Sequence, residues 1–346
     1  MGISENIEFL SNLHGVSGYE HNVAAEIKKL FSPFCDECKI DTLGSVIGIK
    51  KSKNPQGKVM VEAHIDEVGL IITDIDEKGF MYFEEVGGID ARTLLAQEVI
   101  VHGRRDIPGI IGAKPPHILT EKEGKEAVPV DKLYIDTGYG AEQIKEIVKV
   151  SDTVTLKNKT LHLLGGRIST KAQDDRTSVA AIVSVLEQLK DTELPFDLYV
   201  AACVQEEVGL RGGACASYSI DPDFAIVIDV CHAKSPDASE NVFPMGGGAV
   251  LGKGPNIHPV LLDAVINTMK VKDMKYSLNV SGTKTGTDAA ATQIARNGIP
   301  TVLFSLPLRY MHTCIETIDP ADVQLTADAI AEFLKSVKKV GDVVCY

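Results

Sequence analysis

Two short runs of apolar residues constrain the fold most: FDLYVAACV at 196–204 and FAIVIDV at 224–230. The stretch before them carries apolar residues at helical spacing, from Val179 and Ile182 to Leu189. Strands that are apolar along their whole length are buried on both faces, which is typical of a sheet covered by helices. The sequence therefore predicts an α/β domain with a mixed sheet flanked by helices. Further elements of this domain are expected as a strand at 58–63, a helix at about 258–271, a strand at 300–306 and a long helix at 319–339.

The middle of the chain has a different residue pattern. From about Val68 to Thr160, short β-rich runs follow one another, separated by turns such as Glu77-Lys78-Gly79. This pattern predicts a small β-rich module with one short helix near 141–149. A chain of 346 residues exceeds the roughly 250–300 residues that one core usually serves. We therefore expect residues 1–66 and 164–346 to form the α/β domain and residues 67–163 to form an inserted β-rich domain.

Composition excludes several classes of function. The net charge is −13 and no basic stretch offers a face for nucleic acid. No apolar run approaches the ~18 residues of a membrane span, and the first ten residues do not form a secretory signal. The seven cysteines are scattered, which is typical of free thiols in a reducing compartment, and the lone C-x-x-C at Cys35 and Cys38 has no second pair. A cytoplasmic protein is expected.

Acidic and histidine side chains follow the expected strands or open the expected helices at five places. In open α/β sheets, ligands bind beyond the carboxyl ends of the strands, so repeated polar groups at these positions indicate a site. Each group alone has an ordinary structural explanation, because adjacent acids are common in turns and at helix starts. The candidate residues are His64, Asp66, Asp174, Asp175, Glu206, Glu207, Asp229 and His312.

The chemistry of this set favours a metal centre. Clustered carboxylates raise one another's pKa unless a cation keeps them ionised. Two histidines with several carboxylates suit zinc, cobalt or manganese better than a structural zinc held by cysteines. Asp66 is well placed to fix the tautomer of His64. Of the adjacent Glu206 and Glu207, one can bind metal while the other activates a water molecule as general base.

Other chemistries find less support. No G-x-S-x-G motif is present, and Cys203, Cys215 and Cys231 lie in or near expected core elements, so a serine or cysteine hydrolase is not favoured. The glycine-containing segments at 283–288 and 246–248 do not fit a phosphate-binding loop. We expect both segments to be loops whose glycines let the backbone pass close to the site.

Seven motifs together resemble the M42 aminopeptidases, the group that includes the tetrahedral (TET) peptidases and glutamyl aminopeptidases. The resemblance runs over essentially the whole chain. The motifs are AHIDEVG at 63–69, DDR at 174–176, VQEEVGLRGG at 204–213, Asp229, GKGPNIHP at 252–259, GTDAA at 286–290 and RYMHT at 309–313.

The resemblance implies a role for every candidate residue except Asp175. Two divalent metal ions per subunit, commonly zinc or cobalt, would be bound by His64, Asp174, Glu207, Asp229 and His312. His64 and Asp229 would share one ion, Glu207 and His312 the other, and Asp174 would bridge them. Glu206 would be the catalytic base, and Asp66 would orient His64. The inserted domain would be a dimerisation domain, from which many members of the family build hollow dodecamers.

The chain departs from the family's pattern at three places. Thr313-Cys314 replaces a common Ser-Pro, Ser178 replaces a common Gly, and Cys231 and His232 follow Asp229 where a Thr and small residues are more usual. The expected metal-binding residues and the base are all present. Substrate preference and metal choice are therefore the properties that these changes leave open.

The expected function is a metal-dependent aminopeptidase that releases N-terminal residues from peptides with a free amino terminus. Its subunits would form a homo-oligomer, with a dimer as the building block and a tetrahedral dodecamer as a further possibility. Three alternatives stay open: a dimetal deacylase or carboxypeptidase, a glycosidase with paired carboxylates, and an inactive assembly scaffold. The two-carboxylate mechanism of a glycosidase does not explain the presence of His64 and His312 among the candidate residues.

Overall fold

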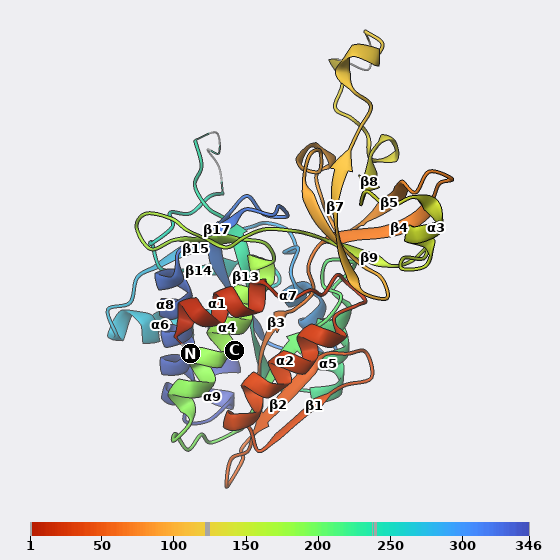
Figure 1. Cartoon of the computed structure of the whole chain (residues 1–346). Helices are drawn as coiled ribbons and strands as arrows, with labels where there is room; N and C mark the ends of the chain where they lie inside the picture. Colours follow the sequence, from red (N-terminus) through yellow and green to blue (C-terminus); the bar gives the residue numbers. More distant parts are fainter. Residues whose placement is uncertain (1, 122–124, 237, 239–240, 346) are drawn as a thin grey trace.

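The protein consists of a helix-covered sheet with a small β-barrel beside it (Figure 1). The structure is a computed structural model, which describes residues 2–121, 125–236, 238 and 241–345. The expected fold class, an α/β domain with an inserted β-rich unit, is confirmed. Within the described part of the chain, no helix combines the length and the apolar character needed to cross a membrane.

The large sheet has eleven strands. Its main path runs β1 (Glu37–Ile40), β2 (Val46–Lys50), β12 (Asp197–Cys203), β3 (Lys58–His64), β13 (Phe224–His232), β16 (Thr301–Arg309), β17 (Glu316–Ile318), β11 (Ile168–Thr170) and β10 (Leu161–His162). Two further strands lie off this path, β14 (Ala249–Lys253), which pairs with β16, and β15 (Tyr276–Val280), which pairs with β14. The four central strands β12, β3, β13 and β16 are parallel, so their carboxyl ends meet along one edge of the sheet.

Helices cover both faces of the sheet because its central strands are apolar on both faces. Along β3, Val59 and Val61 belong to the larger core cluster, while the intervening Met60 belongs to a smaller cluster on the opposite face. The larger cluster includes residues of α1 (Ile3–Ser11), α2 (His21–Phe31), α4 (Gln173–Leu189), α6 (Pro259–Val271) and α8 (Pro320–Ser336). On the opposite face, α5 (Arg211–Ile220) packs against β3 and β12, with α7 (Asp288–Thr292) beside it.

The inserted unit is a closed six-stranded barrel with its own apolar core. Its strands follow one another around the barrel as β4 (Gly69–Ile75), β5 (Met81–Val86), β8 (Tyr134–Asp136), β7 (Asp106–Gly112), β6 (Glu98–His102) and β9 (Thr153–Leu156). The chain enters the barrel after β3 and returns to the large sheet at β10. The described residues between β7 and β8, drawn in yellow, project from the barrel (Figure 1). The domain limits of 66/67 and 163/164 stay a prediction.

Two expected helices end earlier than their sequences suggest. The helix expected at 141–149 is shorter, α3 (Ala141–Lys145), and is followed by a turn in which the N–H groups of Ile147 and Val148 both donate to the carbonyl of Ile144. The helix expected at 319–339 ends at Ser336, where Val337 takes an extended conformation, and a short α9 (Gly341–Val344) follows. Short 3₁₀ turns complete the structure at Ser32–Phe34, Ala91–Thr93, Pro116–Ile118 and Val130–Lys132.

Candidate metal centre

The candidate residues converge at the carboxyl edge of the parallel strands. This convergence follows from the topology, since side chains at the ends of adjacent parallel strands are neighbours. His64 is the last residue of β3, Asp229 lies within β13, and Asp174 lies in the first turn of α4. The remaining members come from the loops after β12 and β16, namely Glu206, Glu207 and His312.

Asp174 lies between the two histidines. Its Oδ1 is 3.1 Å from Nε2 of His64, and its Oδ2 is 3.4 Å from Nε2 of His312. The Nε2 of His312 is also 3.3 Å from Oε1 of Glu207. One carboxylate therefore faces both halves of the cluster, with one oxygen for each.

Among the residues that the structure describes, three sets of ligand atoms are close enough to share a cation, with all the atoms of a set within 4.8 Å of one another. They are His64 with Asp174 and Asp229, Asp174 with Glu207 and His312, and His64 with Glu206 and Glu207. The first two sets share only Asp174, so they are two candidate cation sites with one carboxylate in common. All five expected ligands and the expected base belong to these sets.

The electrostatics of the cluster fit divalent cations. Burial, with help from the neighbouring Asp229, raises the pKa of Glu206 to about 10, although His64 opposes the shift. Burial likewise raises the pKa of Glu207 and of Asp229. So many buried carboxylates are not stable as anions without positive charge, which a bound divalent cation would supply. The histidine and carboxylate donors suit zinc, cobalt or manganese.

The pKa of each histidine reflects the same surplus of carboxylates. Burial lowers the pKa of His312, but hydrogen bonds with Asp174 and Glu207 outweigh it and raise this pKa to about 11. Burial also opposes protonation of His64, whose pKa is nevertheless raised by Glu206 and Asp174. The neighbouring carboxylates thus favour a positive charge at both imidazole rings.

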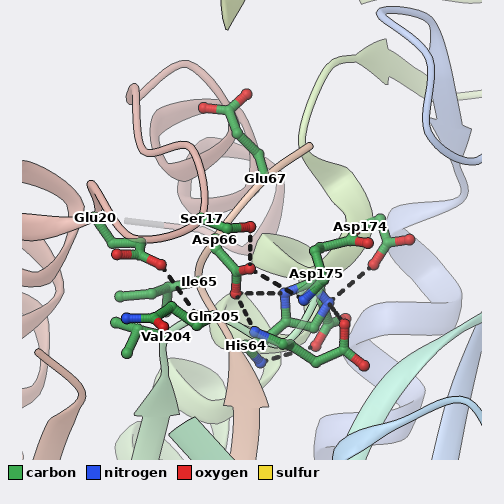
Figure 2. Close-up of polar contacts among 12 residues, drawn as sticks. Ser17, Glu20, His64, Ile65, Asp66, Glu67, Asp174, Asp175, Val204 and Gln205 are labelled. Carbon is green, nitrogen blue, oxygen red and sulfur yellow. Dashed lines mark hydrogen bonds and ion pairs between the residues drawn. The ribbon is translucent and has the colours of Figure 1, made fainter. Parts of the chain in front are cut away.

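Asp66 connects His64 to the glutamate pair. Figure 2 shows the His64 ring between Asp66 and Asp174. Asp66 is fully buried and accepts hydrogen bonds from the hydroxyl of Ser17 at 2.6 Å and from the backbone N–H groups of Glu206 and Glu207 at 3.0 and 3.1 Å. Its Oδ1 is 3.4 Å from Nδ1 of His64, an ion-pair distance whose geometry does not make a hydrogen bond.

Two buried glutamates that sequence reasoning missed fix the backbone around the centre. Glu316 accepts hydrogen bonds from the backbone N–H of His312 at 2.7 Å and of Asp174 at 3.0 Å. Glu20 accepts one from the N–H of Gln205 at 3.0 Å (Figure 2). His312 and Gln205 have left-handed backbones, with φ of 61° and 57°. Such conformations are uncommon outside glycine, and these hydrogen bonds hold them.

Asp175 and Ser178 lie beneath the cluster. The backbone N–H of His64 donates to Oδ2 of Asp175 at 3.3 Å, and the Ser178 hydroxyl donates to Oδ1 of the same carboxyl group. Neither residue belongs to a set of cation ligands. Ser178, one of the departures from the family's pattern, thus supports the carboxyl group that holds the backbone of His64.

A cavity of about 580 Å³ lies beside the cluster. Its lining includes Cys231 and His232, the two unusual residues after Asp229. Burial raises the pKa of the Cys231 thiol, which makes it a poor nucleophile. The segment at 284–287 also lines the cavity, as expected, whereas Gly246 and Gly248 do not and instead donate their N–H groups to Asp322.

Comparison with known proteins gives a consistent result. The model of the M42 glutamyl aminopeptidase family matches residues 44–328. A lysyl aminopeptidase from Pyrococcus furiosus is 34% identical over 330 residues, which cover 94% of each chain. A TET aminopeptidase from the archaeon Thaumarchaeota archaeon SCGC AB-539-E09 superposes with a TM-score of 0.92 at 32% identity, covering 99% of this chain and 98% of that one.

A third similar structure is the TET1 peptidase of Pyrococcus horikoshii, which can assemble into a tetrahedron or a large octahedral shell. It has a TM-score of 0.86 and 30% identity, with coverage of 97% of this chain and 100% of that one. The family match spans most of the sequence, and the structural matches include both the sheet and the barrel. The chain therefore belongs to the M42 family of aminopeptidases and is a peptidase.

Proposed function

We propose that the protein releases N-terminal amino acids from peptides with a free amino terminus, with two divalent cations and a glutamate base. The observation that carries this proposal is the position of Asp174 between His64 and His312, with one carboxylate oxygen toward each ring. His64 and Asp229 would hold one ion with Asp174. Asp174, Glu207 and His312 would hold the other, and the ions would be zinc or cobalt, with manganese also compatible.

Bound divalent cations would polarise the scissile carbonyl and make water a better nucleophile near neutral pH. Glu206 is the residue proposed to accept the proton of the attacking water. Its Oε2 lies 3.9 Å from Nε2 of His64, and its side chain lines the cavity. The same carboxyl group would then return the proton to the amine that leaves when the peptide bond breaks. Asp66 keeps Glu206 in place by accepting its backbone N–H.

We further propose that the protein works as a homo-oligomer whose subunits meet through the barrel, with a dimer as the building block. The assembly of the similar TET1 peptidase into a tetrahedron supports this proposal. A dodecamer is the largest form that we propose. The cytoplasmic location remains part of the proposal and rests on seven cysteines that are all unpaired in the structure.

The test is hydrolysis of Leu-, Glu- and Lys-p-nitroanilide, with N-acetyl-Leu-p-nitroanilide as the blocked control. Each substrate is assayed with the purified protein, after chelation, and after return of zinc, cobalt or manganese. The proposal predicts activity that disappears with chelator, returns with metal and never extends to the blocked substrate. Cleavage of the blocked substrate would indicate a deacylase or another amidase instead, and absence of turnover with every metal would indicate a scaffold.

The relatives named above leave the preferred N-terminal residue open. One is named for lysyl substrates, while the family takes its name from glutamyl substrates. The preference has to come from the cavity of this chain.

A further inference from the structure

The loop after β5 brings the barrel into contact with the candidate metal centre. The carbonyl oxygen of Gly88, in this loop, lies 2.8 Å from Nδ1 of His312. Because a carbonyl oxygen can only accept a hydrogen bond, Nδ1 carries a proton and donates. The other ring nitrogen, Nε2, faces Asp174 and Glu207. The contact with the barrel therefore selects the tautomer of His312 in which Nε2 is left to bind a cation.

The same loop also passes beside Glu207, the other expected ligand on this side of the cluster. A Cβ atom at Gly87 would lie 3.4 Å from the Cβ atom of Glu207. On the far side of Gly88, the side chain of Ile89 is buried in the apolar core of the barrel. A loop whose side chain belongs to the barrel core thus lies against both Glu207 and His312.

The segment after β16 that carries His312 is held by the barrel as well. The side chain of Cys314 belongs to the apolar core of the barrel, and its thiol donates to Oε1 of Gln97 at 3.2 Å. The side-chain amide of Asn158 donates to the carbonyl of Cys314. From the large sheet, Glu316 accepts the backbone N–H of His312 at 2.7 Å. The position of His312 therefore depends on contacts with both the sheet and the barrel.

The other expected histidine ligand is supported differently. Asp66 directly follows the large-sheet strand β3, and its Oδ1 is 3.4 Å from Nδ1 of His64 (Figure 2). This partner is a carboxylate, whereas the partner of His312 is the neutral carbonyl of Gly88. Of the two candidate cation sites, one thus has a charged support beside the large sheet, and the other has a neutral support supplied by the barrel.

We propose that the barrel completes the metal centre and that Gly88 is the positioning residue that orients His312. This inference rests on the proposed two-cation function and gives the barrel a part in it besides assembly. The cation site that contains His312 depends on the contact between the barrel and the α/β domain. The affinity of the site that contains His64 and Asp229 is independent of that contact.

Gly88→Ala tests the inference with one added methyl group. An ideal Cβ atom at this position would lie 3.0 Å from Nδ1 and 3.2 Å from Cε1 of His312, closer than the roughly 3.5 Å of an ordinary contact, so the ring must move. The φ of Gly88 lies outside the left-handed region, which makes alanine compatible with its backbone conformation.

The measurement is a titration of metal-free protein with cobalt in competition with a chromophoric chelator. In Gly88→Ala the affinity for one of the two ions should fall about 10- to 100-fold, the usual effect of disturbing the partner of a metal-binding histidine. The other ion should bind as in the wild type. The visible absorption of the weakened cobalt ion should change, because it reports the coordination geometry. The unfolding of the metal-free variant in urea should stay close to that of the wild type.

Gly140→Ala is the matched control. Gly140 is another barrel glycine, with a φ of −73°, and an ideal Cβ atom at this position meets no atom within 4 Å. The control should bind both ions with wild-type affinity. Asn158→Ala is a second variant, which removes the donor to the carbonyl of Cys314 and loosens the segment of His312 from the barrel. It should weaken the same ion as Gly88→Ala does, by a smaller factor.

The inference is overturned if Gly88→Ala and Asn158→Ala both bind the two ions with wild-type affinity, or if both ions are weakened equally. Should Gly88→Ala not fold, Asn158→Ala decides by the same criteria. Failure of the proposed function has a different signature, because the wild type itself would then bind fewer than two ions per chain or would cleave unblocked substrates without metal.

Discussion

The Oδ1 atom of Asp66 accepts a hydrogen bond of 3.0 Å from the backbone N–H of Glu206. The same oxygen lies 3.4 Å from Nδ1 of His64. One buried carboxylate therefore positions both an expected ligand and the expected base. Partners of this kind tune the affinity of a metal ligand and fix the orientation of its ring.

Asp66→Asn should weaken metal binding by about 10- to 100-fold, because the amide keeps the shape but loses the charge that supports His64. The metal dissociation constant is measured by competition with a chromophoric chelator. Asp263→Asn, an exposed position on α6, is the control and should bind metal as the wild type does. Equal affinity in Asp66→Asn and the wild type would contradict the role given to Asp66.

Glu206→Gln should retain its metal and lose turnover by about 10²- to 10⁴-fold, the range that general-base catalysis contributes. The expected ligands are unchanged in this variant, while glutamine cannot accept the proton. Metal content is measured on the same sample as kcat. A Glu206→Gln protein with normal turnover would remove Glu206 from the mechanism.

Glu67→Gln should destabilise the protein by about 3–5 kcal/mol, the usual effect of leaving buried charges without their partner. Glu67 is buried, and its carboxylate is 2.6 Å from Nζ of Lys171 and 3.1 Å from Nη2 of Arg176. Figure 2 shows its side chain directed away from the metal-binding residues. Although burial opposes ionisation, the two cations hold the pKa of Glu67 below its usual range.

The free energy of unfolding in urea measures this effect. Burial and the nearby Arg176 lower the pKa of Lys171 to about 8 despite Glu67, so the network joins two cations to one anion. Glu98→Gln, which breaks an exposed pair with Lys157 at 2.7 Å, is the matched control and should change stability little. A similar decrease in the free energy of unfolding in both variants would show that the buried network contributes no more to stability than an exposed ion pair.

His14 should make the protein less stable in mild acid. Burial, followed by the nearby Lys171 and His102, lowers the pKa of His14 from 6.5 to about 4. The raising effects of Glu67 and Asp106 are smaller. Between these two pH values the unfolded chain binds more protons at this position than the folded chain. The contribution of His14 to stability is therefore complete above pH 6.5 and is lost as the pH falls toward 4.

Urea unfolding at pH 7 and at pH 4.5 measures the contribution of His14. His14→Gln should lose less stability between the two conditions than the wild type, whereas His117→Gln, at an exposed position, should follow the wild type. Parallel pH profiles for His14→Gln and the wild type would exclude His14 as a source of acid sensitivity.

Much of the fold and of the candidate site could be predicted from sequence because the informative signals are local. The apolar runs at 196–204 and 224–230 lie within β12 and β13 or extend one residue beyond them. A parallel sheet brings the residues that follow its strands to one edge, so His64, Glu206 and Asp229 meet without any direct signal of contact.

The parts that could not be predicted depend on long-range contacts. Glu316 supports His312 and Asp174 from a short strand that pairs with β11 and β16, and nothing near it in sequence distinguishes it from a surface acid. Closure of the barrel likewise depends on pairing β5 with β8 across some fifty residues. The residue pattern of a strand determines neither its partner strand nor the register of pairing when the two strands lie so far apart in sequence.

The central claim is that two cations and a glutamate base act together on a free amino terminus. Metal-free protein is titrated with zinc, cobalt or manganese while bound metal per chain and release from Leu-p-nitroanilide are followed on one sample. The account predicts that full activity requires two ions per chain and that Glu206→Gln binds both ions without turnover. Full activity with no metal bound, or full activity in Glu206→Gln, would contradict it.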